Sequence, residues 1–391
     1  MWQGRAARVA VVAGPDPGHA FPALALCLKF AAAGDDPVLL TGTRWLDQAR
    51  AAGVESVELL GLQPRADDDD ADSGAKIHQR AAHMALANLD QLRALAPDLI
   101  VSDVITACGG MAGELLGVPW VELNPHPLYL PSKGLPPLGS GLAPGVGLRG
   151  RLRDGLMRRL TQKSIDQGLR QRSQARVEIG LPARDPGPIR RLIATLPALE
   201  VPRPDWPVEA VVVGPLHWEP TDVVLQPPSG SGPVVVIAPS TAFTGAEGMT
   251  ELAVQALESA GVRVVISALE PPSSGLPSWA IAGLARQDLL LSGADLAVCG
   301  GGHGFLSKAL LAGVPTVVVP GGGDQWELAN RVVRQGSAEL VRPLSRDSLA
   351  SAIGRVLGEP RYREAARRAA AGATAVEDPV RVCQDVLAAL R

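Results

Sequence analysis

A histidine and an aspartate stand where apolar runs of the sequence turn into helices, and together they have the chemistry of a general base. His19 closes the turn Gly14–His19, after the apolar run Val9–Ala13 and before a helix predicted from Phe21, and Asp103 ends the run PDLIVSD. A carboxylate that accepts a hydrogen bond from one imidazole nitrogen fixes the tautomer and stabilises the imidazolium. The other nitrogen can then take a proton. Each residue also has a structural interpretation, His19 at a helix start and Asp103 as a helix cap, and the pattern leaves both open.

Two glycine-rich turns in the second half of the chain are suited to phosphate and sugar groups. Gly300–Gly304 follows an apolar strand and precedes a helix. Its backbone can approach an anion closely, and the helix N-terminus offers N–H groups and partial positive charge. Pro320–Gln325 ends in Asp324 and Gln325, whose carboxylate and amide suit vicinal hydroxyls. The alternatives are close packing of the first turn and an N-cap by Asp324.

Alternating strands and helices must position these residues. Short Val, Ile and Leu runs without polar alternation predict strands buried on both faces, and therefore parallel sheets with helices on both sides. In doubly wound parallel sheets, ligands lie beyond the carboxyl ends of the strands, where His19, Asp103 and both turns fall. The predicted strands are 9–13, 38–40, 57–60, 99–102, 120–123, 234–238, 262–267, 295–299, 316–319 and 338–341. The predicted helices are 21–33, 79–95, 109–116, 246–260, 304–311 and 327–335.

The strands divide into two sets, which predicts two domains. Residues 214–232 close with the turn-rich run PPSGSG and are interpreted as a linker. They separate a first α/β domain of residues 1–213 from a second of residues 233–378. The amphipathic C-terminal segment, residues 379–391, is expected to pack back across the junction.

Composition excludes several classes of function. The chain of 391 residues has a net charge of −3 and only 3% aromatic residues, so neither a basic field nor a stacking platform favours nucleic acid. A hydrophobic content of 46% is typical of a globular protein and argues against disorder. No run of about 18 apolar residues and no long apolar segment near the start are present, so a cytoplasmic protein is expected.

Cysteine, histidine and acidic residues do not predict a metal site. The four cysteines are far apart with no CxxC pair, and we expect buried free thiols. The acidic run Asp67–Asp70 is interpreted as a solvated loop. His78 and His83 are five residues apart and so do not share one helical face.

A basic segment in the first half has two interpretations. Arg149–Arg159 contains five arginines, and leucines recur every four residues from Leu148 to Leu160. A basic amphipathic helix of this kind can make weak peripheral contact with an anionic membrane. The alternative is an apolar stripe that faces the core, with the charged residues in solvent.

Together these segments resemble the family 1 nucleotide-sugar glycosyltransferases, the family of the macrolide and plant natural-product enzymes. The most specific part is GGGHGFLSKALLAGVPTVVVPGGGDQWELANRV, which resembles their donor-binding signature. The opening GPDPGHAFPALALCLKFAAAG resembles their first strand and helix, and PDLIVSD the segment with the aspartate partner. Pro239–Gly245 and the run from Leu284 resemble their first donor loop and nucleoside-binding loop. The resemblance implies the GT-B architecture, two Rossmann-like domains facing across a cleft.

The resemblance also implies a reaction and a set of site residues. In the implied reaction His19, oriented by Asp103, takes the proton of an acceptor hydroxyl. The hydroxyl oxygen then displaces the nucleotide from a hexose, with inversion and without a metal. The donor is expected to be a UDP or TDP sugar, with no separate cofactor. The residues expected at the donor are Ser240, Thr241, Gln287, Gly301, Gly302, His303, Gly304, Phe305, Lys308, Asp324 and Gln325. Those expected around an apolar, polyketide- or lipid-like acceptor are His126, Leu128 and Tyr129.

The sequence departs from the family pattern at several positions. Gly300 replaces a usual histidine, Phe305 a serine or threonine for the diphosphate, Lys308 a frequent ribose-binding glutamate, and Leu284 a base-stacking tryptophan. We expect Lys308 to reach back toward the turn and contact the diphosphate; the alternative is a lysine that faces solvent. These departures favour, as the alternative function, a glycosyltransferase-like protein that binds without catalysis. A nucleotide-sugar epimerase, which shares the architecture, is a second alternative, opposed by the run around Asp324 and Gln325.

Overall fold

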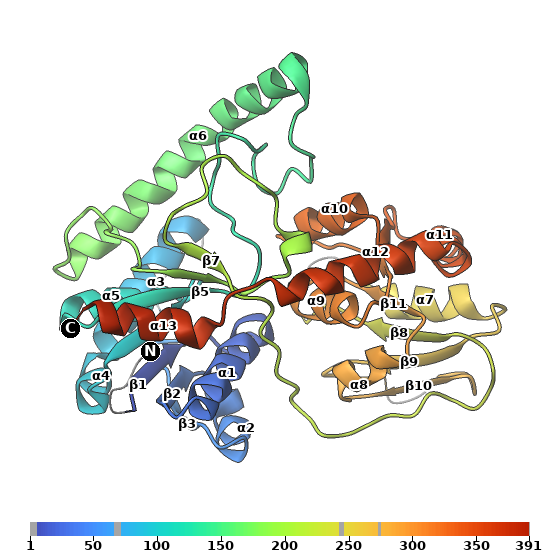
Figure 1. Ribbon diagram of the computed structural model, residues 1–391, viewed down its shortest axis with the longest axis horizontal. Coiled ribbons are helices and arrows are strands. Elements are labelled where there is room, and N and C mark those ends of the chain that lie inside the picture. Colours follow the sequence, from blue (N-terminus) through green and yellow to red (C-terminus); the bar gives the residue numbers. More distant parts are fainter. Residues whose placement is uncertain (1–5, 66–71, 242–245, 273–274, 391) are drawn as a thin grey trace.

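The computed structural model describes residues 6–65, 72–241, 246–272 and 275–390, which form two α/β domains (Figure 1). Each domain contains one sheet of parallel strands, ordered β3-β2-β1-β4-β5-β6-β7 in the first and β10-β9-β8-β11-β12-β13 in the second. The two doubly wound sheets confirm the predicted fold class. The run Asp67–Asp70 and part of the loop Pro239–Gly245 lie outside the described residues.

The strands are short apolar runs, most of them buried on both faces. In the first sheet they are β1 (Arg8–Val12), β2 (Asp36–Thr41), β3 (Glu55–Glu58), β4 (Leu99–Asp103), β5 (Trp120–Asn124), β6 (Arg191–Ile193) and β7 (Ala210–Val212). In the second they are β8 (Val234–Ala238), β9 (Arg263–Ser267), β10 (Ala280–Gly283), β11 (Leu296–Cys299), β12 (Thr316–Val318) and β13 (Ala338–Leu340). All ten predicted strands are confirmed to within two residues at each end. The three that the pattern does not predict, β6, β7 and β10, are three or four residues long and lie at or next to a sheet edge.

Helices cover both faces of each sheet. In the first domain they are α1 (Pro17–Ala32), α2 (Leu46–Ala51), α3 (Ser73–Ala87), α4 (Leu89–Leu95), α5 (Cys108–Leu116) and α6 (Gly147–Glu178). In the second they are α7 (Met249–Leu257), α8 (Gln287–Ser292), α9 (His303–Leu311), α10 (Gln325–Gln335), α11 (Arg346–Gly358) and α12 (Pro360–Ala371), and α13 (Pro379–Ala389) ends the chain. The single helix predicted over 79–95 is wrong. It breaks at Asn88, whose amide nitrogen donates to the carbonyls of Met84 and Leu60 and so competes with helical hydrogen bonds.

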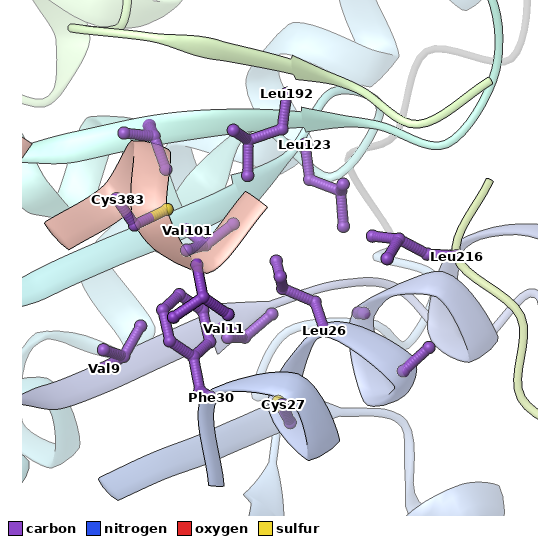
Figure 2. Packing of buried hydrophobic residues seen from close by; sticks show 14 of the residues in the cluster. Val9, Val11, Leu26, Cys27, Phe30, Val101, Leu123, Leu192, Leu216 and Cys383 are labelled. Atoms are coloured by element: carbon purple, nitrogen blue, oxygen red, sulfur yellow. The ribbon is translucent and has the colours of Figure 1, made fainter. Parts of the chain in front are cut away.

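The C-terminal helix packs on the first domain. Side chains of α13, including Cys383, join those of α1, β1, β4 and β5 in one buried cluster (Figure 2). The Gln384 amide also donates to Asp35 at 2.9 Å. The chain therefore leaves the second sheet and returns to cover a face of the first. All four cysteines are buried and free, as expected.

The leucine stripe of helix α6 does not face the core. The four leucines from Leu148 to Leu160 are more than 60% exposed, so a stripe facing the core is wrong. The helix is held instead at its other end, where Arg176, 1% exposed, donates two hydrogen bonds of 2.8 and 2.7 Å to Glu114. No helix in the described part of the chain is both long and apolar enough to cross a membrane.

The Arg176–Glu114 pair generates a test of the fold. Arg176→Ala leaves the Glu114 carboxylate without its partner, and we expect the free energy of unfolding to fall by about 3–5 kcal/mol. Urea denaturation followed by circular dichroism measures it. Arg170→Ala, on the exposed side of the same helix, is the matched control, with an expected change within about 0.5 kcal/mol. Equal changes in the two variants would contradict the assignment.

Candidate active site

The structure brings His19 and Asp103 together at the carboxyl edge of the first sheet. β1 and β4 are neighbours in parallel register, so the segments that follow them start side by side. His19, in the first turn of α1, donates from Nδ1 to Asp103 Oδ2 at 2.6 Å. The other oxygen of Asp103 accepts from the backbone N–H groups of Ile105 and Thr106 and from the Thr106 hydroxyl, at 3.0–3.1 Å. Asp103 is therefore both a turn cap and the partner of His19, which leaves His19 Nε2 as the nitrogen available for proton transfer.

Burial and charge act in opposite directions on this pair. The Asp103 side chain is fully buried and that of His19 is 17% exposed. Burial by itself disfavours both charged forms, but mutual attraction outweighs it. The pKa of His19 is raised and that of Asp103 is lowered, the latter also through the hydrogen bonds from Thr106. The carboxylate thus stays ionised and stabilises a proton on the imidazole.

Aromatic rings connect the dyad to the second domain. The rings of His19 and His126 meet edge to face at 6.4 Å, and His126 stacks on Tyr129 at 4.3 Å. The Tyr129 hydroxyl donates to Asp324 Oδ2 at 3.3 Å, and burial, then the Asp324 charge, raises the pKa of this phenol well above its usual value. Leu128 does not join this surface. Its side chain is buried with Ile193 and Ala210, so the expectation that it lines the acceptor pocket is wrong.

The glycine turn between β11 and α9 lies close to its neighbours. A Cβ at Gly301, which has φ +83°, would lie 2.9 Å from Val318 Cγ1, and one at Gly300 would lie 3.0 Å from Ser240 Cβ. The turn therefore has little room for the side chain that relatives of the resembled family carry at position 300. Gly304, in the first turn of α9, is exposed. The first N–H groups of a helix have no partner within it, which suits an anion at this point.

His303 and Phe305 use their side chains for packing. His303 Nε2 is hydrogen-bonded to the Thr195 hydroxyl of the first domain at 2.8 Å. Burial lowers the pKa of His303 well below its usual value, so it is a neutral contact between the domains. The Phe305 ring packs against the core. The expected donor role of these two residues therefore falls to their backbone N–H groups rather than to their side chains.

The side chain of Gln325 joins two turns of the second domain. It donates to Ser240 Oγ at 2.8 Å and accepts from the Gly321 N–H at 2.9 Å, and it is 4% exposed. Asp324 and Thr241 are exposed. Asp324 therefore presents its carboxylate outward while Gln325 holds the turn in place.

Lys308 is paired with the interdomain segment. Its ammonium lies 2.7 Å from Glu219 Oε1 and donates to Gln287 Oε1 at 3.1 Å. The side chains of Lys308 and Glu219 are 9% and 10% exposed, so a lysine facing solvent is wrong. The Glu219 carboxylate also accepts from the first backbone N–H groups of α8, at 3.3 Å. The segment between the domains, α8 and α9 are thus joined at one carboxylate.

Charged residues of α10 make further contacts with the first domain. Arg331 donates to the Leu199 carbonyl at 3.0 Å and to Glu327 at 3.1 Å. Glu327 accepts from the Gly141 N–H at 3.1 Å, and Arg331 lies 3.6 Å from Glu200. These contacts hold the loop that carries Tyr129 against the helix that begins after Asp324.

Comparison with known proteins shows which proteins the chain resembles. Residues 281–389 match the family described as "Erythromycin biosynthesis protein CIII-like, C-terminal domain". Over 401 aligned residues the chain is 27% identical to 4'-demethylrebeccamycin synthase of Lentzea aerocolonigenes, covering 93% of this chain and 94% of that protein. These matches support the predicted resemblance to the family 1 glycosyltransferases.

Solved structures place this glycosyltransferase in the GT-B fold. The spinosyn forosaminyltransferase superposes with a TM-score of 0.76 over 98% of this chain and 100% of that one, at 17% identity. A glycosyltransferase of Streptomyces sp. SF2575, crystallised with thymidine diphosphate, has a TM-score of 0.68 over 97% and 99% of the two chains, at 18% identity. The predicted family and architecture are confirmed.

Several residues at the site of the glycosyltransferase have no signal in the sequence pattern. Thr195 follows a three-residue strand that the pattern does not predict, and Glu219 lies in a segment interpreted only as a linker. Thr106 has a weak signal, because a threonine three residues after an aspartate suits a turn. Within the described ranges no three His, Cys, Asp or Glu side chains gather as a metal site.

The dyad of the glycosyltransferase generates a test by titration. We expect His19 to titrate in NMR spectra with a midpoint above its ordinary value of about 6.5. In Asp103→Asn the midpoint moves to lower pH, because burial still disfavours the imidazolium and the opposing carboxylate charge is gone. The spectrum of the parent protein under the same conditions is the reference. A His19 midpoint that does not move would show that the carboxylate does not act on the imidazole.

Proposed function

We propose that this glycosyltransferase moves a hexose from a nucleoside-diphosphate sugar to the hydroxyl of an apolar small molecule, with inversion at the anomeric carbon. Transfer of a sugar to a small-molecule acceptor follows from the comparisons; the apolar acceptor and the inversion are proposals. The observation that carries them is the 2.6 Å hydrogen bond that holds His19 against a buried carboxylate, with Asp324 of the other domain nearby. A relative crystallised with spinosyn aglycone supports an apolar acceptor.

The arrangement supports a single displacement. The acceptor hydroxyl gives its proton to His19 Nε2 as its oxygen bonds to the anomeric carbon, and the bond from that carbon to the diphosphate oxygen breaks. Asp103 stabilises the imidazolium that forms. The backbone N–H groups at the start of α9 would donate hydrogen bonds to the departing diphosphate and stabilise its negative charge. Attack opposite the leaving group inverts the anomeric centre.

The sugar and the nucleotide would contact different parts of the second domain. Asp324 is the exposed carboxylate beside the dyad and the proposed acceptor of sugar hydroxyl hydrogen bonds. Gln325 and Ser240 support it by holding the turn. Gln287 and Lys308 lie at the start of α8 and in α9, where they form the proposed nucleotide side. A UDP or TDP donor is proposed, supported by the relative with bound thymidine diphosphate.

A catalytically silent, donor-binding protein is the second candidate. It is favoured by Phe305, whose ring is packed away from the turn, and by Lys308, whose charge Glu219 neutralises. The hydrogen-bonded dyad opposes it, because a protein that only binds has no use for an oriented base. Two measurements separate the candidates. A thermal-shift panel of UDP, TDP and GDP sugars identifies the donor, and mass spectrometry detects transfer to hydroxylated polyketide- or lipid-like acceptors. A shift without any product would support the silent candidate.

Replacement of the base tests the reaction. We expect His19→Ala to lower the rate of transfer by roughly 10²–10⁴-fold, the usual contribution of a positioned base, while calorimetry shows nearly unchanged donor affinity. His83→Ala, on α3, is the control and should keep the rate of the parent. Retention of more than about a tenth of the rate in His19→Ala would contradict a role as base.

Variants of the Lys308–Glu219 pair test how Lys308 contributes to donor binding. Because the ammonium is already paired, we expect it to act through Glu219 and Gln287 rather than on the diphosphate directly. Lys308→Gln should weaken nucleoside-diphosphate binding, since a buried carboxylate is left unpaired. The double variant Lys308→Gln, Glu219→Gln should recover much of the loss. Calorimetry measures both, and a double variant as weak as the single would instead support direct contact with the phosphates.

A further inference from the structure

Exposed apolar side chains are concentrated on one element of this protein. Leu148, Leu152, Leu156 and Leu160 of α6 are between 61% and 78% exposed, and Val146, just before the helix, is 91% exposed. Five large apolar side chains thus meet solvent within 15 residues of chain. The core clusters of both domains leave these residues out.

The leucines form one face together with cations. Each step of four residues advances about 40° around a helix of 3.6 residues per turn, so the four leucines span an arc of about 120°. By the same geometry Arg149, Arg159 and Lys163 lie within or beside that arc. We name these seven side chains the α6 face.

The protein holds the α6 face outward. Among the residues that the structure describes, the first turns of α6 are hydrogen-bonded to the loop that precedes them: Asp154 accepts from the Gly145 N–H at 2.7 Å, Arg153 donates to the Ala143 carbonyl at 2.7 Å, and Arg158 to the Leu135 carbonyl at 2.7 Å. The far end is anchored by Arg176 and by packing against α3. Figure 1 shows α6 extending away from both sheets. The leucines are therefore displayed by a helix that is fixed at both ends.

The charge on this half of the helix selects an anionic partner. Arg149, Arg159 and Lys163 are exposed and have no ion pair among the residues that the structure describes. Between Gly147 and Lys163 the sequence contains one acidic residue, Asp154, which is buried and already bonded. A second copy placed on this face would bring cation against cation. A partner surface that is both anionic and apolar complements the leucines and the cations.

We propose that the α6 face is a docking surface for a lipid bilayer that contains anionic headgroups. The leucines enter the boundary between headgroups and acyl chains, and Arg149, Arg159 and Lys163 contact lipid phosphates. The loop before α6 carries Tyr129, which contacts Asp324. If the proposed function holds, docking therefore brings the acceptor side of the enzyme near a phase in which apolar small molecules concentrate. Docking itself does not depend on the reaction.

Co-sedimentation of the full-length protein with vesicles tests the proposal. Vesicles are made of phosphatidylcholine alone or with about one third phosphatidylglycerol, an anionic lipid. We expect binding to the anionic vesicles only, weakened by added salt because surface charges are screened. Changing Leu148, Leu152, Leu156 and Leu160 together to Ser should lower the affinity by at least about tenfold, since their insertion is lost. Changing Arg149, Arg159 and Lys163 together to Gln should lower it similarly.

A charge-matched variant serves as the control. Arg367, Arg368 and Arg381 are exposed on α12 and α13, and their change to Gln removes the same net charge elsewhere, so vesicle binding should stay close to that of the parent. Circular dichroism and the thermal-shift response to donor sugars check that each variant is folded, independently of transfer. Three results would overturn the proposal: no binding of the parent, equal binding to both lipid mixtures, or unchanged binding in the leucine variant. A parent dimer that the leucine variant loses, without vesicle binding, would assign the α6 face to a second copy.

Discussion

The site depends on one buried carboxylate. Asp103 is fully buried, and a charge in that position is costly unless it is paired and hydrogen-bonded. Its two oxygens have different partners, since one accepts three hydrogen bonds from the turn after β4 and the other accepts from His19. The first set holds the carboxylate in a single orientation. The hydrogen bond to His19 then orients the imidazole. The turn after β4 therefore determines where the base in the connection after β1 points.

The second domain reaches this base through a series of polar contacts. Tyr129 donates to Asp324, and His303, neutral because it is buried, bonds to Thr195. Arg331 adds a charged contact with the first domain. These contacts are hydrogen bonds, and their directionality restricts how the two domains are oriented. The position of Asp324 relative to His19 is therefore set by the same contacts that join the domains.

Two departures from the family pattern, at Gly300 and Lys308, are each matched by a neighbouring residue in the structure. Glycine at position 300 lets the turn lie against Ser240, which in turn bonds to Gln325. A cation at position 308 is neutralised by Glu219, which also accepts from the start of α8. Gly300 and Lys308 each have a neighbour whose position or charge depends on them. A single change back to the common residue would leave a steric overlap at Gly300 or, at Lys308, carboxylates next to one another.

The sequence by itself determined the parallel sheets, the position of His19 and Asp103 at one sheet edge, and the backbone turn before α9. These follow from local rules: short apolar runs predict buried strands, and the carboxyl ends of parallel strands lie together. The sequence did not determine which side chains face the site. His303, Phe305, Gln325, Lys308 and Leu128 all lie in or beside predicted turns, yet the structure buries or pairs each of them. Thr195 and Glu219, the partners of His303 and Lys308, are tens of residues away in the chain, and only the tertiary structure brings them within hydrogen-bond distance. The leucines of α6 show the opposite outcome, because a periodicity that would suit a core carries no information about whether a second element is present to cover it.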